Sequence, residues 1–180
     1  MEIINTEIPG VLLLRPNVFE DHRGYFLESY NERALASAGF TPRFLQDNHS
    51  YSRRGVLRGL HYQITQPQGK LVRVVSGEIL DVALDLRRDS AFFGKWLGRR
   101  LSSENKLMMW IPPRFAHGFM VLSESADVVY KTTDYYAPEF ERTILWNDPD
   151  LAISWQLTGN PVMSQKDMAG KRLRDAELEP

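Results

Sequence analysis

Short runs of apolar and β-branched residues, each bounded by glycine, proline or polar residues, recur along this 180-residue chain. Several of them alternate apolar and polar side chains with the period of two expected for a strand that has one buried face. Nine such runs predict strands at residues 10–16, 24–30, 56–63, 69–77, 78–86, 95–102, 107–113, 116–123 and 126–136. So many short strands at this spacing favour an antiparallel sandwich or barrel over a parallel α/β sheet. The predicted fold class is therefore all-β.

Helix signals are few and short. Asn31 is a suitable N-cap for the segment "NERALASAG", which ends at the C′ glycine Gly39, and a short C-terminal helix is expected from Ser164. The tripeptide 76–78, "SGE", is expected to form a tight turn between two strands. No repeat, low-complexity stretch or linker divides the chain, so we expect one domain over residues 1–180 with a few short peripheral helices.

Charge and cysteine content exclude several classes of function. Lysine and arginine number 22 against 23 aspartates and glutamates, so no basic field is present to hold nucleic acid. The absence of cysteine rules out disulfides, a thiolate nucleophile and cysteine-based zinc sites. The N-terminal sequence fits neither a signal peptide nor a membrane span. We therefore expect a soluble, cytoplasmic protein that binds neither nucleic acid nor membrane.

Two of the four histidines lie inside predicted strands beside other polar groups. These are His61 in "GVLRGLHYQ" and His117 in "WIPPRFAHGF", whereas His22 and His49 lie in polar, turn-like sequence and are expected at the surface. A metal site on strands needs three or four ligands and would often read His-x-His. Here the third residue of that triplet is Gln63 and no glutamate follows closely. The sequence therefore argues against a catalytic metal.

Basic and aromatic side chains also interrupt the apolar runs, close to glycines or prolines. The basic residues are Arg23, Arg58, Lys70, Arg73 and Arg114, and the tyrosines are Tyr130, Tyr135 and Tyr136. Carboxylates that could orient or neutralise them are Asp21, Glu28, Asp81, Asp85 and Asp167. Any one of these charges could belong to a solvated strand face. Together they fit a pocket for a phosphorylated ligand that also holds a proton-transfer group.

The run 55–63 raises a geometric question. In a regular strand Arg58 and His61 are three residues apart and point to opposite faces. Either Arg58 faces away from His61, or a bulge at Gly59 turns both side chains to one face. Glycine is a common residue at bulges and sharp bends, so we expect the bulge.

Six blocks of the sequence, in order, resemble the dTDP-4-dehydrorhamnose 3,5-epimerases, the sugar-nucleotide epimerases of the dTDP-L-rhamnose pathway. They are "DHRGYFLESY" (21–30), "FLQDNHSYS" (44–52), "GVLRGLHYQ" (55–63), "QGKLVRVVSGEILDVALDLR" (68–87), the blocks within 110–148 and "SQKD" (164–167). The resemblance implies a metal-free jelly roll of the cupin type that acts as a homodimer on a nucleotide sugar and requires no cofactor.

The resemblance also implies a role for individual residues. His61 would be the general base, Asp167 its carboxylate partner, Tyr130 the acid on the opposite face of the sugar, and Lys70 the cation beside the keto oxygen. Residues implied to contact the nucleotide sugar are Arg23, Phe26, Glu28, Gln46, Asn48, Arg58, His117 and Tyr136. The first three of these would reach into the pocket of the partner subunit.

The implied substrate is a 4-keto-6-deoxy sugar carried on dTDP, whose C3 and C5 protons both lie α to the C4 carbonyl. A base on one face and an acid on the other would invert each centre through an enolate, which a fixed cation stabilises. Two alternatives stay open. One is a related cupin that inverts a single centre or moves the keto group to C3 of the same substrate. The other is a non-catalytic sugar-binding or metal-sensing cupin.

Overall fold

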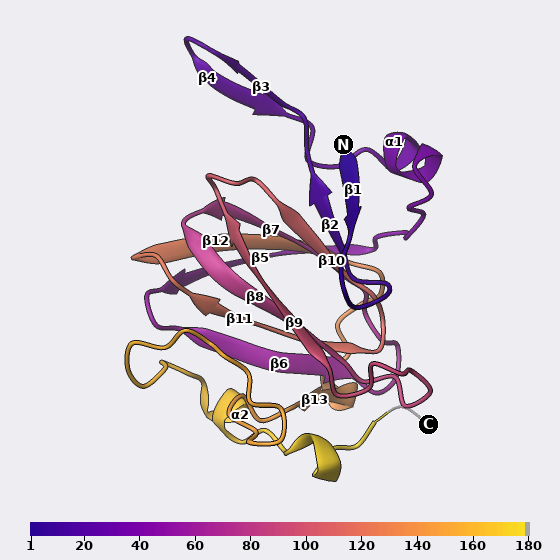
Figure 1. The fold of residues 1–180 in the computed structure, drawn as a ribbon, viewed down its shortest axis with the longest axis vertical. Coiled ribbons are helices and arrows are strands. Elements are labelled where there is room, and N and C mark those ends of the chain that lie inside the picture. Colours follow the sequence, from indigo (N-terminus) through magenta and orange to yellow (C-terminus); the bar gives the residue numbers. More distant parts are fainter. Residues whose placement is uncertain (179–180) are drawn as a thin grey trace.

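The computed structural model describes residues 1–178 as two packed β-sheets with a separate hairpin (Figure 1). The six-stranded sheet contains, in spatial order, β1 (Glu2–Asn5), β2 (Leu12–Arg15), β10 (Met108–Ile111), β7 (Lys70–Ser76), β12 (Ser125–Thr132) and β5 (Gln46–Arg53). The five-stranded sheet contains β13 (Glu141–Thr143), β6 (Leu57–Gln63), β11 (Phe115–Val121), β8 (Glu78–Asp85) and β9 (Trp96–Ser102). Neighbouring strands are antiparallel throughout. The predicted all-β sandwich is confirmed; residues 179–180 of the predicted domain lie outside the described residues.

Alternate side chains of both sheets fill the space between them. Val72 and Val74 of β7 meet Ile79 of β8 and Phe115 and Phe119 of β11 in one buried cluster. Full burial of a side chain of this kind contributes about 1.5–3 kcal/mol. The period of two in the sequence therefore reports the inner faces of the two sheets correctly.

Segments outside the sheets cover much of their outer faces. The chain after β13 packs Leu151 and Trp155 onto the outer face of the five-stranded sheet, where they join Leu57 and Leu60 of β6. On the other side, Phe40 stands edge-on to Trp110 at 5.1 Å between ring centroids. Most of β6 is therefore buried, although Arg58 remains exposed.

Both helices begin where the sequence predicted. The Oδ1 atom of Asn31 accepts the Ala34 N–H at the start of α1 (Glu32–Ser37), and Ser164 caps α2 (Gln165–Met168) in the same way. The second helix is shorter than its sequence indicated, because Lys171 leaves the helix and its backbone pairs with that of Thr143 and Leu145. Two single 3₁₀ turns, η1 (Pro138–Phe140) and η2 (Leu173–Asp175), follow β12 and α2 respectively.

The turn at 76–78 joins β7 to β8, with Gly77 at φ +81°. The two strands belong to different sheets, so the turn carries the chain from one layer to the other and closes no hairpin. A Cβ at Gly77 would lie 2.0 Å from the carbonyl oxygen of Ser125, which explains the glycine.

A hairpin of β3 (Val18–Asp21) and β4 (Gly24–Leu27) projects away from both sheets (Figure 1). Its two strands pair only with each other within the described chain, and Phe19 lies opposite Phe26. These two rings are 63% and 69% exposed. Exposed aromatic pairs of this kind mark contact surfaces in soluble proteins.

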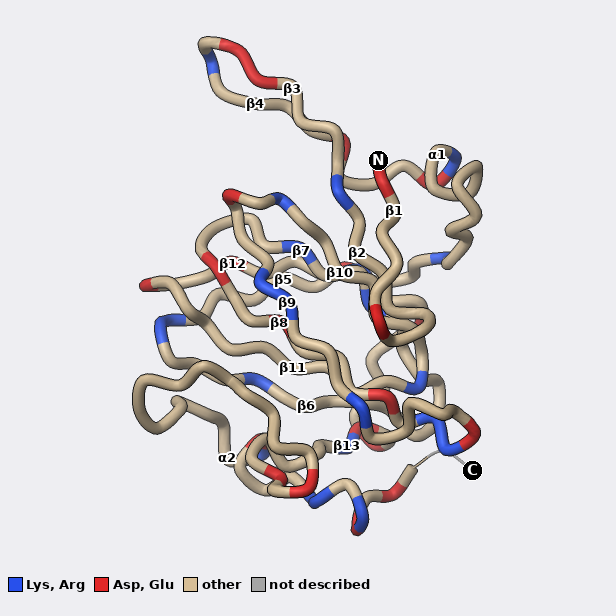
Figure 2. Tube along the Cα trace, viewed as in Figure 1, with Lys and Arg blue, Asp and Glu red and all other residues tan. Residues whose placement is uncertain are grey.

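Basic and acidic side chains are interspersed over the described chain (Figure 2), in keeping with a net charge of −1. None of the helices within residues 1–178 is long and apolar enough to cross a membrane.

Candidate active site

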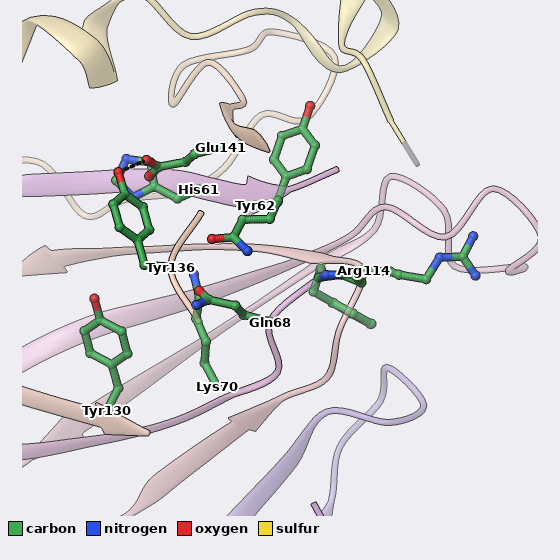
Figure 3. Close-up of a pocket in the computed structure, with 11 residues that line it drawn as sticks. His61, Tyr62, Gln68, Lys70, Arg114, Tyr130, Tyr136 and Glu141 are labelled. Atoms are coloured by element: carbon green, nitrogen blue, oxygen red, sulfur yellow. Dashed lines mark hydrogen bonds between the residues drawn. The ribbon is translucent and has the colours of Figure 1, made fainter. Parts of the chain in front are cut away.

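A pocket opens between the two sheets. His61 and Gln63 of β6 form part of one wall, and Lys70 of β7 and Tyr130 of β12 form part of the opposite one. Figure 3 shows His61 on the upper strand and Lys70 and Tyr130 rising from below. The structure brings three of the four predicted catalytic candidates, His61, Lys70 and Tyr130, to one pocket. The fourth, Asp167, is hydrogen-bonded to His61.

The predicted bulge at Gly59 is present. His61 lies opposite His117 on β11, but Arg58 lies opposite Phe119, so three steps along β6 match two along β11. Gly59 has φ +107°, and a Cβ there would meet the carbonyl oxygen of His117 at 2.6 Å. The extra residue turns Arg58 toward the opposite sheet, where its Nε donates to Ser52 Oγ at 2.9 Å. Arg58 and His61 thus share one face.

His61 is bound to a carboxylate that lies 106 residues further along the chain. Its Nε2 atom forms a hydrogen bond with Oδ1 of Asp167, which is carried by α2. Burial tends to raise the pKa of Asp167, but hydrogen bonds from His61, the Ser164 hydroxyl and the Gly59 N–H hold the pKa below its ordinary value. An ionised carboxylate only accepts hydrogen bonds, so the proton of the neutral ring lies on Nε2. The Nδ1 lone pair is left to accept a proton.

Lys70 is a cation on the wall of the same pocket. Burial lowers the pKa of its ammonium to about 8, and the charges of Glu141 and Asp81 partly oppose that shift. Lys70 therefore remains largely charged at neutral pH. A charge in such a desolvated position interacts more strongly with a developing negative charge than it would in water.

Tyr130 and Lys70 lie on neighbouring strands and point to the same face of the sheet. Tyr130 pairs with Val72, which is two residues from Lys70 on β7, and Thr132 pairs with Lys70 itself. Burial raises the pKa of its hydroxyl. The side chain is consequently protonated at neutral pH and can donate a proton. Tyr130 and His61 thus reach the pocket from opposite sheets.

A second polar cluster at the pocket was not singled out from the sequence. The Tyr136 hydroxyl donates to Glu141 Oε2 at 2.6 Å, and the Lys166 ammonium donates to the same oxygen. Burial tends to raise the pKa of Glu141, but these two donors hold it below its ordinary value. Tyr136 was predicted from the sequence, whereas Glu141 and Lys166 were not. The signals that could have identified them were the position of Glu141 inside the long matching block and the position of Lys166 directly before Asp167.

Other predicted contacts line the inner face of β5. Gln46 donates through Nε2 to Asn48 Oδ1 at 2.9 Å and accepts the Tyr136 N–H at 3.1 Å. Asn48 is the register partner of Tyr130. His117 lies deeper, 5% exposed, with its Nε2 2.6 Å from Asp81 Oδ1. It stands behind the pocket wall and not on it.

Three predicted contacts lie apart from this pocket. Arg23 and Phe26 are on the projecting hairpin, where Arg23 pairs with Asp21 at 2.6 Å, and Glu28 follows the hairpin and accepts from Asn31. Two further residues belong to the basic and aromatic set. Arg73 lines the outer face of the six-stranded sheet, whereas Arg114 borders this pocket with its side chain directed away from the other labelled residues (Figure 3).

Within residues 1–178, no group of three or more histidine, aspartate or glutamate side chains is placed to hold a metal ion. The titratable groups that the structure brings to the pocket are the His61–Asp167 pair, Lys70, Tyr130 and the cluster of Tyr136, Glu141 and Lys166.

Comparisons with known proteins agree with this arrangement. The family model described as dTDP-4-dehydrorhamnose 3,5-epimerase matches residues 5–175. A Pseudomonas aeruginosa protein of that name is 59% identical over 181 residues, covering all of both chains. The crystal structure of a Legionella pneumophila 3,5-epimerase, in complex with dTDP-4-keto-L-rhamnose, has a TM-score of 0.95 and 51% identity. The alignment covers 98% of this chain and 94% of that one.

A more distant neighbour acts on one centre. The 3′-monoepimerase of Streptomyces bikiniensis, in complex with dTDP-quinovose, has a TM-score of 0.90 and 31% identity, covering 95% of this chain and 87% of that one. The overlap with these structures confirms the predicted cupin-type jelly roll. By sequence over its whole length and by structure, the chain belongs to the dTDP-4-dehydrorhamnose 3,5-epimerase family.

Proposed function

We propose that the protein inverts C3 and C5 of dTDP-4-dehydro-6-deoxy-D-glucose to give dTDP-4-dehydro-L-rhamnose, in the synthesis of dTDP-L-rhamnose. One observation carries the proposal: His61 and Tyr130 reach the same pocket from opposite sheets, with Lys70 on the same wall as Tyr130. A base and an acid on opposite sides of a sugar ring are what inversion at a carbon α to a carbonyl requires.

In the first half of each inversion, Nδ1 of His61 takes the proton from the carbon. The electron pair of the broken C–H bond moves to the C4 oxygen and forms an enolate. Asp167, already bonded to Nε2, stabilises the imidazolium that results. General-base catalysis by a positioned side chain contributes about 10²–10⁴-fold to the rate.

The enolate oxygen is the group that needs a positive charge. Lys70 provides it from a desolvated position, so the charge is in place before the reaction begins and needs no reorganisation.

In the second half, the Tyr130 hydroxyl delivers a proton to the opposite face of the same carbon while the enolate returns to the ketone. The raised pKa of Tyr130 keeps that proton available at neutral pH. The tyrosinate then regains its proton from solvent, and His61 loses the one it took, so each cycle is balanced.

Binding of the nucleotide part would hold the ring in place for these steps. Arg58, Gln46, Asn48 and Tyr136 lie on or beside the pocket walls. Guanidinium groups pair well with phosphate oxygens, and an aromatic ring offers a face to the thymine. Binding energy from a part of the substrate that does not react can then be used to orient the part that does.

We further propose that the working unit is a cytoplasmic homodimer whose hairpins exchange. The exposed Phe26 and the neighbouring Arg23 cannot serve the pocket of their own chain from the projecting hairpin, and a second copy would bring them to its pocket (Figure 1). A mixing experiment tests this. Arg23→Ala/Phe26→Ala and His61→Ala proteins should each be inactive, while unfolding and refolding them together should restore roughly a quarter of native activity, because half of the dimers then hold one complete site. No recovery in mixed dimers would contradict the exchange.

The reaction itself is tested in heavy water. Incubation of the 4-keto sugar nucleotide with the protein should place deuterium at both C3 and C5 and yield the L-rhamno product. Deuterium and inversion at one carbon alone would support the second candidate, a single-centre epimerase, which the likeness to the Streptomyces bikiniensis 3′-monoepimerase keeps in view. Binding without any exchange would support a non-catalytic cupin.

A further inference from the structure

A second histidine–aspartate pair lies wholly inside the barrel, and the mechanism above does not use it. Asp81 of β8 is 0% exposed, and its Oδ1 is 2.6 Å from Nε2 of His117. The other oxygen, Oδ2, is buried and has no hydrogen-bond partner within residues 1–178. Leaving a buried carboxylate oxygen unpaired costs free energy, so its retention beside a reactive site points to a use for its charge.

The tautomer of His117 follows from this contact. Burial first of all, and then the positive charges of Lys70 and His61, lower the pKa of the ring although Asp81 favours its protonation. The ring is therefore neutral. Since an ionised carboxylate can only accept, the single ring proton lies on Nε2 and Nδ1 is an acceptor.

Asp81 also faces the charges of the pocket. Its negative charge favours the protonated form of Lys70, as does the charge of Glu141 on β13. Its own register neighbour on β9, Arg99, is engaged with Glu7 at 2.5 Å.

The remaining titratable groups packed against the pair are His61 on β6 and Tyr130 on β12, whose ring centroid is 6.4 Å from that of His117. When His61 takes a proton, a second cation appears close to Lys70. Asp81, on the strand next to β11, then adds a buried negative charge to those of Asp167 and Glu141.

We propose that Asp81 is a positioning residue of the epimerase site: it holds neutral His117 in its Nε2–H tautomer and acts as interior counter-charge to the Lys70 ammonium. The inference deepens the proposed function and rests on it. Asp81 touches no reacting atom, so its effect passes through His117 and Lys70.

Asp81→Asn in the full-length protein tests the counter-charge. We expect kcat to fall about 10- to 100-fold, the size of effect seen when partners that orient reactive groups are removed, with KM little changed. The alkaline limb of the pH–rate profile, set by Lys70 near pH 8, should move to lower pH because the carboxylate that favours the ammonium is gone. An alkaline limb that stays in place would overturn the proposal.

Asp85→Asn is the matched control. Asp85 is equally buried on the same face of β8, but it is held by Arg87 at 2.6 Å and by Ser90. That variant should lose stability without moving the alkaline limb. An equal displacement in both variants would show a general effect of removing a buried charge, and it would contradict a specific role for Asp81.

A measurement on the unchanged protein covers the case in which Asp81→Asn does not fold. Nitrogen-15 NMR of labelled histidine should show His117 protonated on Nε2 and unprotonated on Nδ1 from about pH 6 to about pH 9, across the range in which an ordinary histidine titrates. A ring that titrates there, or that carries its proton on Nδ1, would overturn the proposal. Failure of the proposed function would appear separately, as a native protein that does not exchange C3 or C5 protons.

Discussion

His61 and His117 are register partners on neighbouring strands, and the Nε2 atom of each ring contacts its own buried aspartate. Their side chains differ in access: that of His61 is 28% exposed and that of His117 is 6% exposed. Only the first can meet a substrate in the pocket as the structure stands. Because both histidines have a carboxylate partner, the greater exposure of His61 is the reason for proposing it as the base.

Replacing His61 by alanine should reduce proton exchange at C3 and C5 by about 10²–10⁴-fold or more, because the proton acceptor is lost. Exchange is measured by deuterium uptake in heavy water. The matched control is His49→Ala, which removes an exposed histidine that is also paired with an aspartate, Asp127, on the outer face of the six-stranded sheet. Undiminished exchange in His61→Ala would reject this residue as base.

Tyr130→Phe should separate the two halves of the reaction. Proton removal by His61 remains possible, so wash-out of label from the substrate should persist, while inversion at C5 should slow by about 10²-fold or more. The control is Tyr135→Phe, which changes an exposed tyrosine five residues along the chain. If inversion at C5 kept its native rate in Tyr130→Phe, another group would have to be the acid.

Gly59→Ala should be more harmful than an ordinary glycine substitution at positive φ. A Cβ at Gly59 would collide with the backbone of β11, at 2.7 Å from the Gly118 Cα, whereas a Cβ at Gly55, with φ +80°, meets no atom within 4 Å. Gly55→Ala should therefore carry only the conformational penalty, about 1 kcal/mol. Gly59→Ala should lose several times that in unfolding free energy, together with activity, because the bulge that aligns Arg58 with His61 cannot form. Equal losses by chemical denaturation would contradict this.

Lys70→Met should make the protein inactive and more stable. The folded-state pKa of about 8 lies below the ordinary value of 10.5, so the folded protein binds the proton less well than the unfolded chain. At neutral pH both states are protonated and the penalty is fully present; it declines as pH rises from about 8 to about 10.5.

The difference in pKa corresponds to about 3 kcal/mol at most, and we expect a gain of about 1–3 kcal/mol in unfolding free energy at pH 7. The comparison is made at one protein concentration, because association affects apparent stability. Lys131→Met, which removes a lysine paired with Asp47 at the surface, should change stability by less than about 1 kcal/mol. A destabilised Lys70→Met would show that the ammonium is a net stabilising group.

The predicted strands that lie in the two sheets have at least one apolar face. Val72, Val74, Ile79 and Phe119 follow the period of two, and their strands lie close to the expected places. Strand β5 was missed because "QDNHSYSR" is polar on both faces: one face borders the pocket and the other is largely exposed. A hydrophobic pattern cannot mark a strand whose inner face lines a polar site.

Some features of the candidate site could likewise be predicted from the sequence, and others could not. The bulge at Gly59 was predictable because the face to which a strand side chain points follows from its position in the sequence. A glycine allows that alternation to be broken. The pairing of His117 with Asp81 joins positions 36 residues apart on adjacent strands, and it depends on a register that composition does not encode. Glu141 and Lys166 meet for the same reason, through the packing of α2 against the edge of the five-stranded sheet.

The contact between His61 and Asp167 has a consequence for the life of the chain. During translation the histidine leaves the ribosome 106 residues ahead of its carboxylate. The barrel strands can pair before α2 has been made, but the nascent protein cannot yet orient its base. His61 gains its carboxylate partner only once α2 has docked against the sheets, so the ring of this histidine is fixed late in the formation of the fold.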